Sequence, residues 1–391
     1  MDFLLVILIC LALSFLLSEV FYRFNYPQVL GPIFAGLILG LPIFRPAFEG
    51  NIMINIEFLS TLGIIFLLFL AGLEVNIKKL IKTEKDSVAI SIFGAIIPFV
   101  LGFSMMILMG YSNLSAIVLG ACLSLTAEGT TVKILLDMKA LNTKVGTILL
   151  GAGIIDDIFE IIFLSVVLVL AQKSFEKLVW FPVEIFAFIA ITYLAYKFIP
   201  KLIRLIQIEK TRVADFTVLL IIVITIALIS TRLSLGPVIG AFAAGIIINI
   251  LHHKNKRHKQ HYEEVEEFKT MTFGLIIPFF FINIGLHFDV ASLINNIGLV
   301  ILVLVVATAG KIIGALVAKP LTDLSWKQSY LVGWGMNSRG AVELVIAEIA
   351  RMSGLISSEL YSAIVIMAVF TTMLFPVILR AMIKKDRKIM Y

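Results

Sequence analysis

The sequence predicts an all-α, polytopic membrane protein in which thirteen helices cross the bilayer. Three observations lead to this fold class. The 391 residues are 60% hydrophobic and only 15% charged, whereas about 25% charged residues are usual in soluble domains. The apolar residues form runs long enough to span a hydrocarbon core. Several connections between these runs are very short, so neighbouring helices are expected to form antiparallel hairpins.

The apolar runs define the predicted helices, which we number one to thirteen. They occupy residues 2–22, 28–44, 57–74, 87–110, 114–137, 146–171, 180–204, 213–232, 236–252, 271–288, 296–318, 327–350 and 358–383. Basic residues gather in the loops after odd-numbered helices, for example Lys78, Lys139 and Lys254, and in the tail at Lys384. Because such residues concentrate in cytoplasmic loops, we expect a plasma-membrane protein with the N-terminus outside and the C-terminus in the cytoplasm. The net charge of +6 is then explained by basic cytoplasmic loops of a protein in the lipid bilayer, and no nucleic-acid partner is predicted.

Helices two and three resemble helices nine and ten. Helix two begins LGPIFAGLILG at Leu30, and helix nine begins LGPVIGAFAAG at Leu235. The end of helix three, FLLFLAGLEVNIKKL, aligns without a gap with FFFINIGLHFDVASL of helix ten. Matched helices are seven apart, an odd number, so the two copies cross the membrane in opposite senses. The pattern predicts an inverted repeat of residues 1–172 and 211–391, joined by a linker helix within 173–210 and typical of secondary transporters.

Helix six carries acidic residues at membrane depth. Asp156 and Asp157 are adjacent, and Glu160 follows one turn later. A carboxylate at this depth costs several kcal/mol or more unless it faces a cavity, a cation or a partner charge. Lys311 lies equally deep in helix eleven, so we expect it to pair with Asp156 and to leave Asp157 for a cation or proton. Glu160 is expected to line the same cavity or to pair with Arg339.

Polar, glycine-rich segments occur at matching positions of helices five and twelve. They indicate helices that unwind, which is tolerated at membrane depth only inside protein or at a cavity. The ends of the half-helices would present partial charges, and freed carbonyls could coordinate a cation. The alternative is hydroxyl-mediated packing between intact helices. The residues concerned are Thr126, Glu128, Gly129 and Thr130 in helix five, and Gly335, Asn337, Ser338 and Arg339 in helix twelve.

Other charged residues are assigned structural or surface roles. Glu343, Glu348 and Glu74 are expected to pair with Arg or Lys. Four histidines are expected in a solvated cytoplasmic loop, where their titration could tune activity: His252, His253, His258 and His261. Their spacing fits no standard zinc site, and the two cysteines lie in apolar runs. The sequence therefore predicts no cofactor.

The sequence resembles the cation/proton antiporter superfamily, and within it the prokaryotic sodium/proton exchangers that are similar to Kef-type carriers. The motifs that carry the resemblance are FLLFLAGLEVNIKKL, SLTAEGTTVKILLDM, GIIDDI, GKIIG and GMNSRGAVELVIA, and they cover essentially the whole chain. The resemblance implies a homodimer whose subunits each have two bundles. Helices four to six and eleven to thirteen would form a core with crossed broken helices, and helices one to three and eight to ten a dimerisation bundle. It also implies that Asp157 binds Na+ or a proton, that Asp156 pairs with Lys311, and that Thr126 and Thr130 add oxygens.

The predicted activity is antiport of Na+ or Li+ against H+ by alternating access, in the service of pH homeostasis. Family potassium carriers often have Gln or Asn before the second acid, so the Asp156–Asp157 pair favours sodium or lithium. Glu128 and Glu160 depart from the commoner small or neutral residues and change the charge of the site. K+/H+ exchange and a Na+-coupled organic-anion symporter remain alternatives. A channel would be expected to show a filter motif, and an enzyme an intramembrane catalytic constellation; neither pattern is visible.

Overall fold

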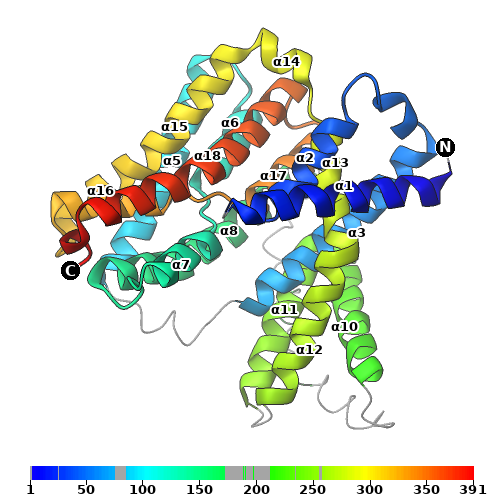
Figure 1. Cartoon of the computed structure of the whole chain (residues 1–391), viewed down its shortest axis with the longest axis horizontal. Coiled ribbons are helices and arrows are strands. Elements are labelled where there is room, and N and C mark those ends of the chain that lie inside the picture. Colours follow the sequence, from blue (N-terminus) through cyan, green and yellow to red (C-terminus); the bar gives the residue numbers. More distant parts are fainter. Residues whose placement is uncertain are drawn as a thin grey trace. The chain divides into compact units, whose positions relative to one another are not determined.

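The computed structural model describes residues 2–24, 26–74, 85–171, 212–233, 235–254 and 258–391, with isolated positions between 172 and 211. All regular elements in these ranges are helices (Figure 1). Seven helical spans within the described residues are long and apolar enough to cross a membrane, so the chain is a multi-pass membrane protein. Lys78 and, apart from isolated positions, the predicted seventh helix, 180–204, lie outside the described residues.

The chain divides into two compact units. Unit 1 comprises Met1–Phe15, Pro32–Val75 and Gln172–Leu286. Unit 2 comprises Leu16–Gly31, Asn76–Ala171 and His287–Tyr391. The first helix, α1 (Phe3–Arg23), contributes residues to both units, and the next helix, α2 (Leu30–Leu39), begins in unit 2 and continues in unit 1 from Pro32.

Unit 1 is built from apolar helices that approach one another closely at glycines. A Cβ added at Gly72 in α3 would overlap the carbonyl oxygen of Phe242 in α11. A Cβ added at Gly36 in α2 would overlap that of Ile282 in α13. Only glycine lets two helix backbones approach this far. The helices of this unit are α2 (Leu30–Leu39), α3 (Asn51–Glu74), α10 (Arg212–Arg232), α11 (Pro237–Lys254), α12 (His258–Met271) and α13 (Ile277–Leu286), with short turns η1 (Arg45–Phe48) and η2 (Thr272–Ile276).

All four histidines of the predicted loop lie in helices, so the prediction of a loop at these positions is wrong. His252 and His253 lie in α11, and His258 and His261 lie in α12. The sequence of α12, HKQHYEEVEEFKTM, is rich in Glu, Lys and Gln, which are strong helix formers. A search for apolar runs misses such a polar helix. The π-helical turn η2 then joins α12 to the apolar α13.

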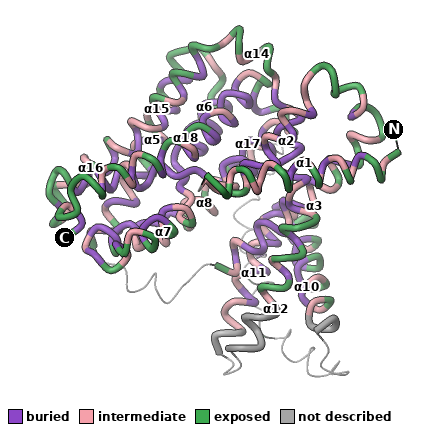
Figure 2. The backbone as a smooth tube through the Cα atoms, viewed as in Figure 1, coloured by how far each residue is buried: buried purple, intermediate pink, exposed green. Residues whose placement is uncertain are grey.

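Unit 2 is organised around α5, which packs against α6, α8 and α15. Glycines bring α15 close to α5, because a Cβ at Gly314 would lie only 2.6 Å from the carbonyl oxygen of Phe93. Figure 2 shows mostly buried positions along α17. The helices are α5 (Lys85–Leu108), α6 (Asn113–Ser124), α7 (Glu128–Asp137), α8 (Lys144–Ala171), α14 (Val290–Asn295), α15 (Ile297–Ala318), α16 (Trp326–Gly335), α17 (Ala341–Met352) and α18 (Ser358–Lys385), with 3-10 turns η3 (Lys319–Leu321) and η4 (Arg387–Met390).

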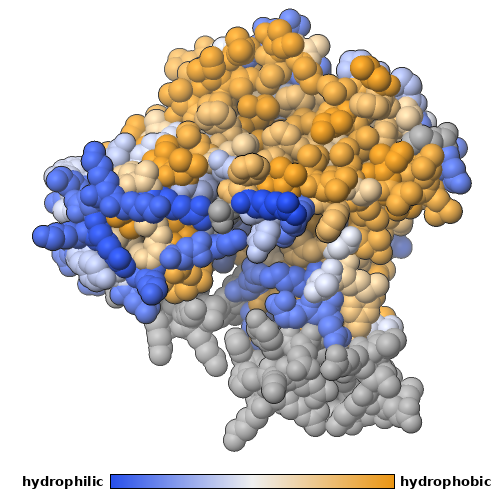
Figure 3. Space-filling model, in the orientation of Figure 1, coloured by the Kyte–Doolittle hydropathy of each residue, from blue (hydrophilic) through white to orange (hydrophobic). Residues whose placement is uncertain are grey.

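The surface of unit 2 separates apolar from charged residues. Apolar side chains cover α15, where Ile301 and Val305 are both 55% exposed, as expected for a face in lipid (Figure 3). Hydrophilic residues gather where α7 ends, α8 and α16 begin and the chain ends (Figure 3). Contacts tie these segments together: Lys144 Nζ donates to the carbonyl of Asp323 at 2.6 Å, and Arg387 donates to that of Met138 at 3.4 Å. We call this region the α7–α8 end.

Candidate functional site: carboxylates beside two interrupted helices

Two helices of unit 2 are interrupted, and the interruptions touch each other. The first lies between α6 and α7, where Leu125 and Ala127 are extended. The second lies between α16 and α17, and its last residue, Gly340, is also extended. The backbone N–H of Ala127 donates to the carbonyl of Ser338 at 2.9 Å. A Cβ at Gly340 would overlap Ala127, so a glycine is needed where the two segments cross.

The predicted break residues divide between helix and interruption. Asn337 and Ser338 lie in the second interruption. Gly335 is the last residue of α16, and Gly129 lies in the first turn of α7, where no described atom approaches within 4 Å of an added Cβ. Helix α7 therefore resumes before Gly129. Its first residue, Glu128, is acidic, which favours a helix N-terminus.

Charged side chains satisfy the backbone at the ends of two half-helices. Arg339 donates to the carbonyls of Cys122, Leu123 and Leu125, at 3.1, 2.9 and 2.5 Å, where α6 ends. Glu343 accepts the backbone N–H of Gly340, at 2.8 Å, where α17 begins. A cation at a helix C-terminus and an anion at an N-terminus both oppose the partial charges there.

The structure describes the partners of four predicted charge-pairing residues. Among the described residues, Arg339 binds carbonyl groups and forms no ion pair with Glu160, because its guanidinium reaches the end of α6. Glu343 caps α17, and it also interacts electrostatically with Arg339 and Lys311. Glu348 does pair with Arg351 at 2.7 Å, and Glu74 pairs with Lys269 at 3.2 Å, as the sequence predicts.

Lys311 lies beside the first interruption and is fully buried. Its ammonium group donates to the carbonyl of Ser124 at 2.5 Å and to the hydroxyl of Thr126 at 2.6 Å. Asp156 Oδ2 lies 3.4 Å from the same nitrogen, and Asp156 is only 1% exposed. The hydroxyl of Ser91 donates to Asp156 Oδ1 at 2.5 Å. This carboxylate is therefore held by one cation and one hydroxyl.

Three further carboxyl groups lie near this buried pair. Asp157, Glu160 and Glu128 are half-buried. Glu160 lies within electrostatic range of Asp157, Asp156 and Glu128. Helix α8 is long enough to span a bilayer, but any 18-residue segment of it includes Asp156, Asp157 and Glu160. Of the adjacent aspartates, one is therefore fully buried in an ion pair and the other is partly accessible.

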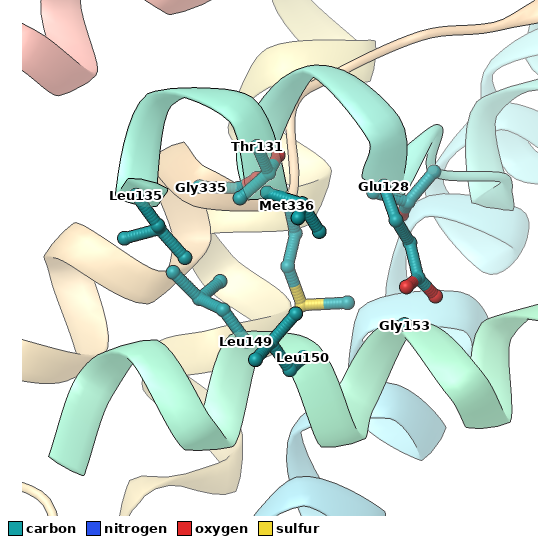
Figure 4. Close-up of a pocket in the computed structure, with 10 residues that line it drawn as sticks. Glu128, Thr131, Leu135, Leu149, Leu150, Gly153, Gly335 and Met336 are labelled. Carbon is teal, nitrogen blue, oxygen red and sulfur yellow. The ribbon is translucent and has the colours of Figure 1, made fainter. Parts of the chain in front are cut away.

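A small pocket opens beside Glu128 (Figure 4). Its volume is about 10 Å³, near the minimum that holds one water molecule. It is lined by Thr126, Glu128, Thr131, Val132, Leu135, Leu149, Leu150, Gly153, Gly335 and Met336. The predicted oxygen donor Thr130 lies in α7 and is half-buried, but it does not line this pocket.

Three residues of this region escape the sequence analysis. Ser91 binds Asp156 from α5, but nothing in the surrounding AISIFGA distinguishes it. The hydroxyl of Thr131 donates to the carbonyl of Gly335 at 2.9 Å and ties α7 to α16. Gly153 lies four residues before Asp157 on α8. This spacing places the two residues on one face of the helix and is the feature of the sequence that could have identified Gly153.

Comparison with known proteins decides the family. The family described as "Sodium/hydrogen exchanger, transmembrane" matches residues 5–385. The chain belongs to the sodium/hydrogen exchanger family. As a member of this family, it is a transporter and not an enzyme.

Relatives of this sodium/hydrogen exchanger match it over nearly their whole length. The Na(+)/H(+)-K(+) antiporter GerN of Bacillus cereus is 30% identical, over 93% of this chain and 92% of that protein. The Na(+)/H(+) antiporter of Enterococcus hirae is 30% identical, over 98% of this chain and 99% of that protein. Among solved structures, the sodium proton antiporter MjNhaP1 from Methanocaldococcus jannaschii at pH 8 has a TM-score of 0.69 and 17% identity, with 98% of this chain and 96% of that chain covered. The exchanger therefore shares the fold of that structure.

Proposed function

We propose that this chain exchanges Na+ for H+ across the cell membrane, with Asp157 as the carboxylate for which the two ions compete. The observation that carries the proposal is the buried Lys311–Asp156 pair, which lies against the first interrupted helix. Asp156 directly precedes Asp157 in the chain. Relatives named as Na+/H+ antiporters support sodium as the cation.

The chemistry follows from the properties of a half-buried carboxylate. Such a group can hold a proton or a sodium ion, but not both. Lys311 neutralises Asp156, so one bound Na+ or proton at Asp157 leaves the Asp156–Asp157 pair without net charge. The hydroxyls of Thr126 and Thr130 are candidate additional oxygen ligands. If only an occupied site lets the protein change conformation, uncoupled leak is suppressed.

The glycine contacts in unit 1 support the inverted repeat. In the proposed register, Gly72 matches Gly285, and Gly40 matches Gly245. Added Cβ atoms at Gly72 and Gly245 would each overlap the backbone of the other's helix, which joins α3 and α11. An added Cβ at Gly285 would overlap the backbone of α2, and one at Gly40 would lie 3.1 Å from the carbonyl oxygen of Gly285. Matched glycines thus make matched contacts, as a repeat of 1–172 and 211–391 requires.

The two units suggest a division of labour. We propose that unit 2 is the moving core, because it holds both interruptions and the described acids near Lys311. Unit 1 then supplies the fixed scaffold and the homodimer interface, and the thirteen-helix count requires a linker helix within 173–210. Loops rich in basic residues meet at the α7–α8 end, so we assign that end to the cytoplasm, with the N-terminus outside.

Ion-driven proton movement in proteoliposomes tests this function. The purified protein is reconstituted into vesicles that enclose a pH-sensitive dye. The vesicle interior is made acidic, and Na+, Li+ or K+ is then added outside. We expect Na+ and Li+ to collapse the gradient and K+ to do so far less well. A response to K+ alone would establish the potassium alternative, and no response to any of the three ions would refute the proposed exchange.

A further inference from the structure

The side chain of Glu128 occupies a place that α8 leaves vacant. A Cβ built on Gly153 would coincide with the Cδ and Oε1 atoms of Glu128. Figure 4 shows the carboxyl group of Glu128 reaching from α7 down to α8 at Gly153. The carboxyl group thus stands where a side chain of residue 153 would begin.

This position aligns Glu128 with the acids of α8. Residues 153, 157 and 160 follow the spacing that places side chains on one face of a helix. Side chains four residues apart have Cβ atoms about 5–6 Å apart. Seated at Gly153, the Glu128 carboxyl group lies one helical turn from Asp157, and Glu160 lies one turn beyond. The three carboxyl groups therefore form a row along α8.

The pocket beside Glu128 meets this row at one end. Glu128 and Gly153 both line it, together with the hydroxyl-bearing Thr126 and Thr131. Thr126 also accepts a hydrogen bond from Lys311, so the pocket adjoins the buried pair. The other lining residues come from α7, the first half of α8 and the end of α16, which places the pocket between Asp157 and the α7–α8 end.

An acidic residue at the start of α7 could instead serve only to stabilise that helix. That role needs a negative charge near the first N–H groups of α7 and makes no demand on α8. A role in ion transfer along α8 does need Gly153, because any side chain there would displace the carboxyl group of Glu128. The two roles therefore predict different effects of changes at residue 153.

Resting on the exchange function proposed above, we propose that Glu128 is a second ion-carrying carboxylate, which passes protons and monovalent cations between the pocket and Asp157. In one direction Glu128 takes up Na+ from the pocket and hands it to Asp157. In the other, the proton released by Asp157 moves to the Glu128 carboxylate and from there to water in the pocket. Each carboxylate holds one monovalent ion at a time, so charge is conserved at every step.

The Michaelis constant for Na+ at each membrane face tests this role. Na+/H+ exchange is measured in inside-out and right-side-out vesicles from cells without other sodium/proton exchangers. For Glu128→Gln we expect the KM at the cytoplasmic face to rise about tenfold, the change that 1.4 kcal/mol of lost attraction produces. The KM at the outer face should change less than about twofold, because the pocket lies on the cytoplasmic side of Asp157 in the proposed topology.

Two further variants distinguish the position of the Glu128 carboxyl group at Gly153 from its negative charge at the start of α7. Gly153→Ala retains every charge but displaces the Glu128 carboxyl group, so the cytoplasmic KM should rise here too. Glu128→Asp keeps the charge at the start of α7 but is shorter by about 1.5 Å, the length of one carbon–carbon bond. It should also raise the KM. Gly298→Ala is the matched control, since no described atom lies within 4 Å of its added Cβ.

The outcomes distinguish this inference from the proposed function. No exchange by the wild type would refute both. Exchange by the wild type with an unchanged KM in Glu128→Gln or Gly153→Ala would refute the role of Glu128 alone. An equal rise at both faces, or wild-type behaviour of Glu128→Asp, would also refute it.

Discussion

Replacing Lys311 with methionine removes the cation that holds Asp156. The ammonium group serves the Ser124 carbonyl, the Thr126 hydroxyl and the Asp156 carboxylate, and both charged residues are at most 1% exposed. Methionine fills a similar volume, so the main loss is electrostatic. Removing one partner of a buried ion pair typically costs about 3–5 kcal/mol, because a buried charge is left without compensation. We expect Lys311→Met to lower the free energy of unfolding by this amount.

The double variant Lys311→Met/Asp156→Asn provides the internal comparison. It removes the uncompensated charge as well as the cation, so it should be more stable than Lys311→Met by about 2 kcal/mol or more. Unfolding in mixed micelles, followed by tryptophan fluorescence, gives both values. A loss below about 1 kcal/mol in Lys311→Met, or a double variant no more stable than Lys311→Met, would show that the pair does not stabilise the protein as the distances imply.

Three other substitutions probe the framework around the site. Arg339→Met leaves the carbonyls at the end of α6 without their charged donor and should cost at least about 3 kcal/mol in the same unfolding assay. Full stability would contradict the capping role. Glu343→Ala removes the acceptor at the start of α17 and should cost about 1 kcal/mol; no measurable loss would count against the cap. Gly72→Ala places a methyl group on the Phe242 carbonyl and should lower the melting temperature, whereas Gly274→Ala, with open space around its Cβ, should not. Equal melting temperatures for these two variants would contradict the close packing of α3 and α11.

Hydropathy placed the described helices well, because burial in lipid requires long apolar runs. The predicted run 146–171 corresponds to α8 at Lys144–Ala171, and 358–383 corresponds to α18 at Ser358–Lys385. The same reasoning fails for α12, because that helix is polar and its stability comes from helix-forming residues. The interruptions lie in the polar segments that the sequence singles out, since unwound backbone at depth needs polar surroundings.

The partners of individual site residues depend on tertiary structure and were harder to predict. Arg339 binds carbonyl groups, and a carbonyl acceptor has no signature in the sequence. The seat of Glu128 on Gly153 joins two helices whose packing could not be inferred from periodicity. Lys311 and Asp156 were easier, because a buried lysine needs a carboxylate and few carboxylates lie at membrane depth.

The most direct test of the account is sodium-driven proton movement by Asp157→Asn in proteoliposomes. Asparagine keeps the shape of the side chain but can neither hold a proton at neutral pH nor balance a cation. The control is Asp137→Asn, which changes a surface acid whose pair with Arg380 at 3.4 Å should contribute little. We predict that Asp157→Asn elutes as a folded protein and shows no exchange, while Asp137→Asn exchanges like the wild type. Full exchange by folded Asp157→Asn would contradict the account.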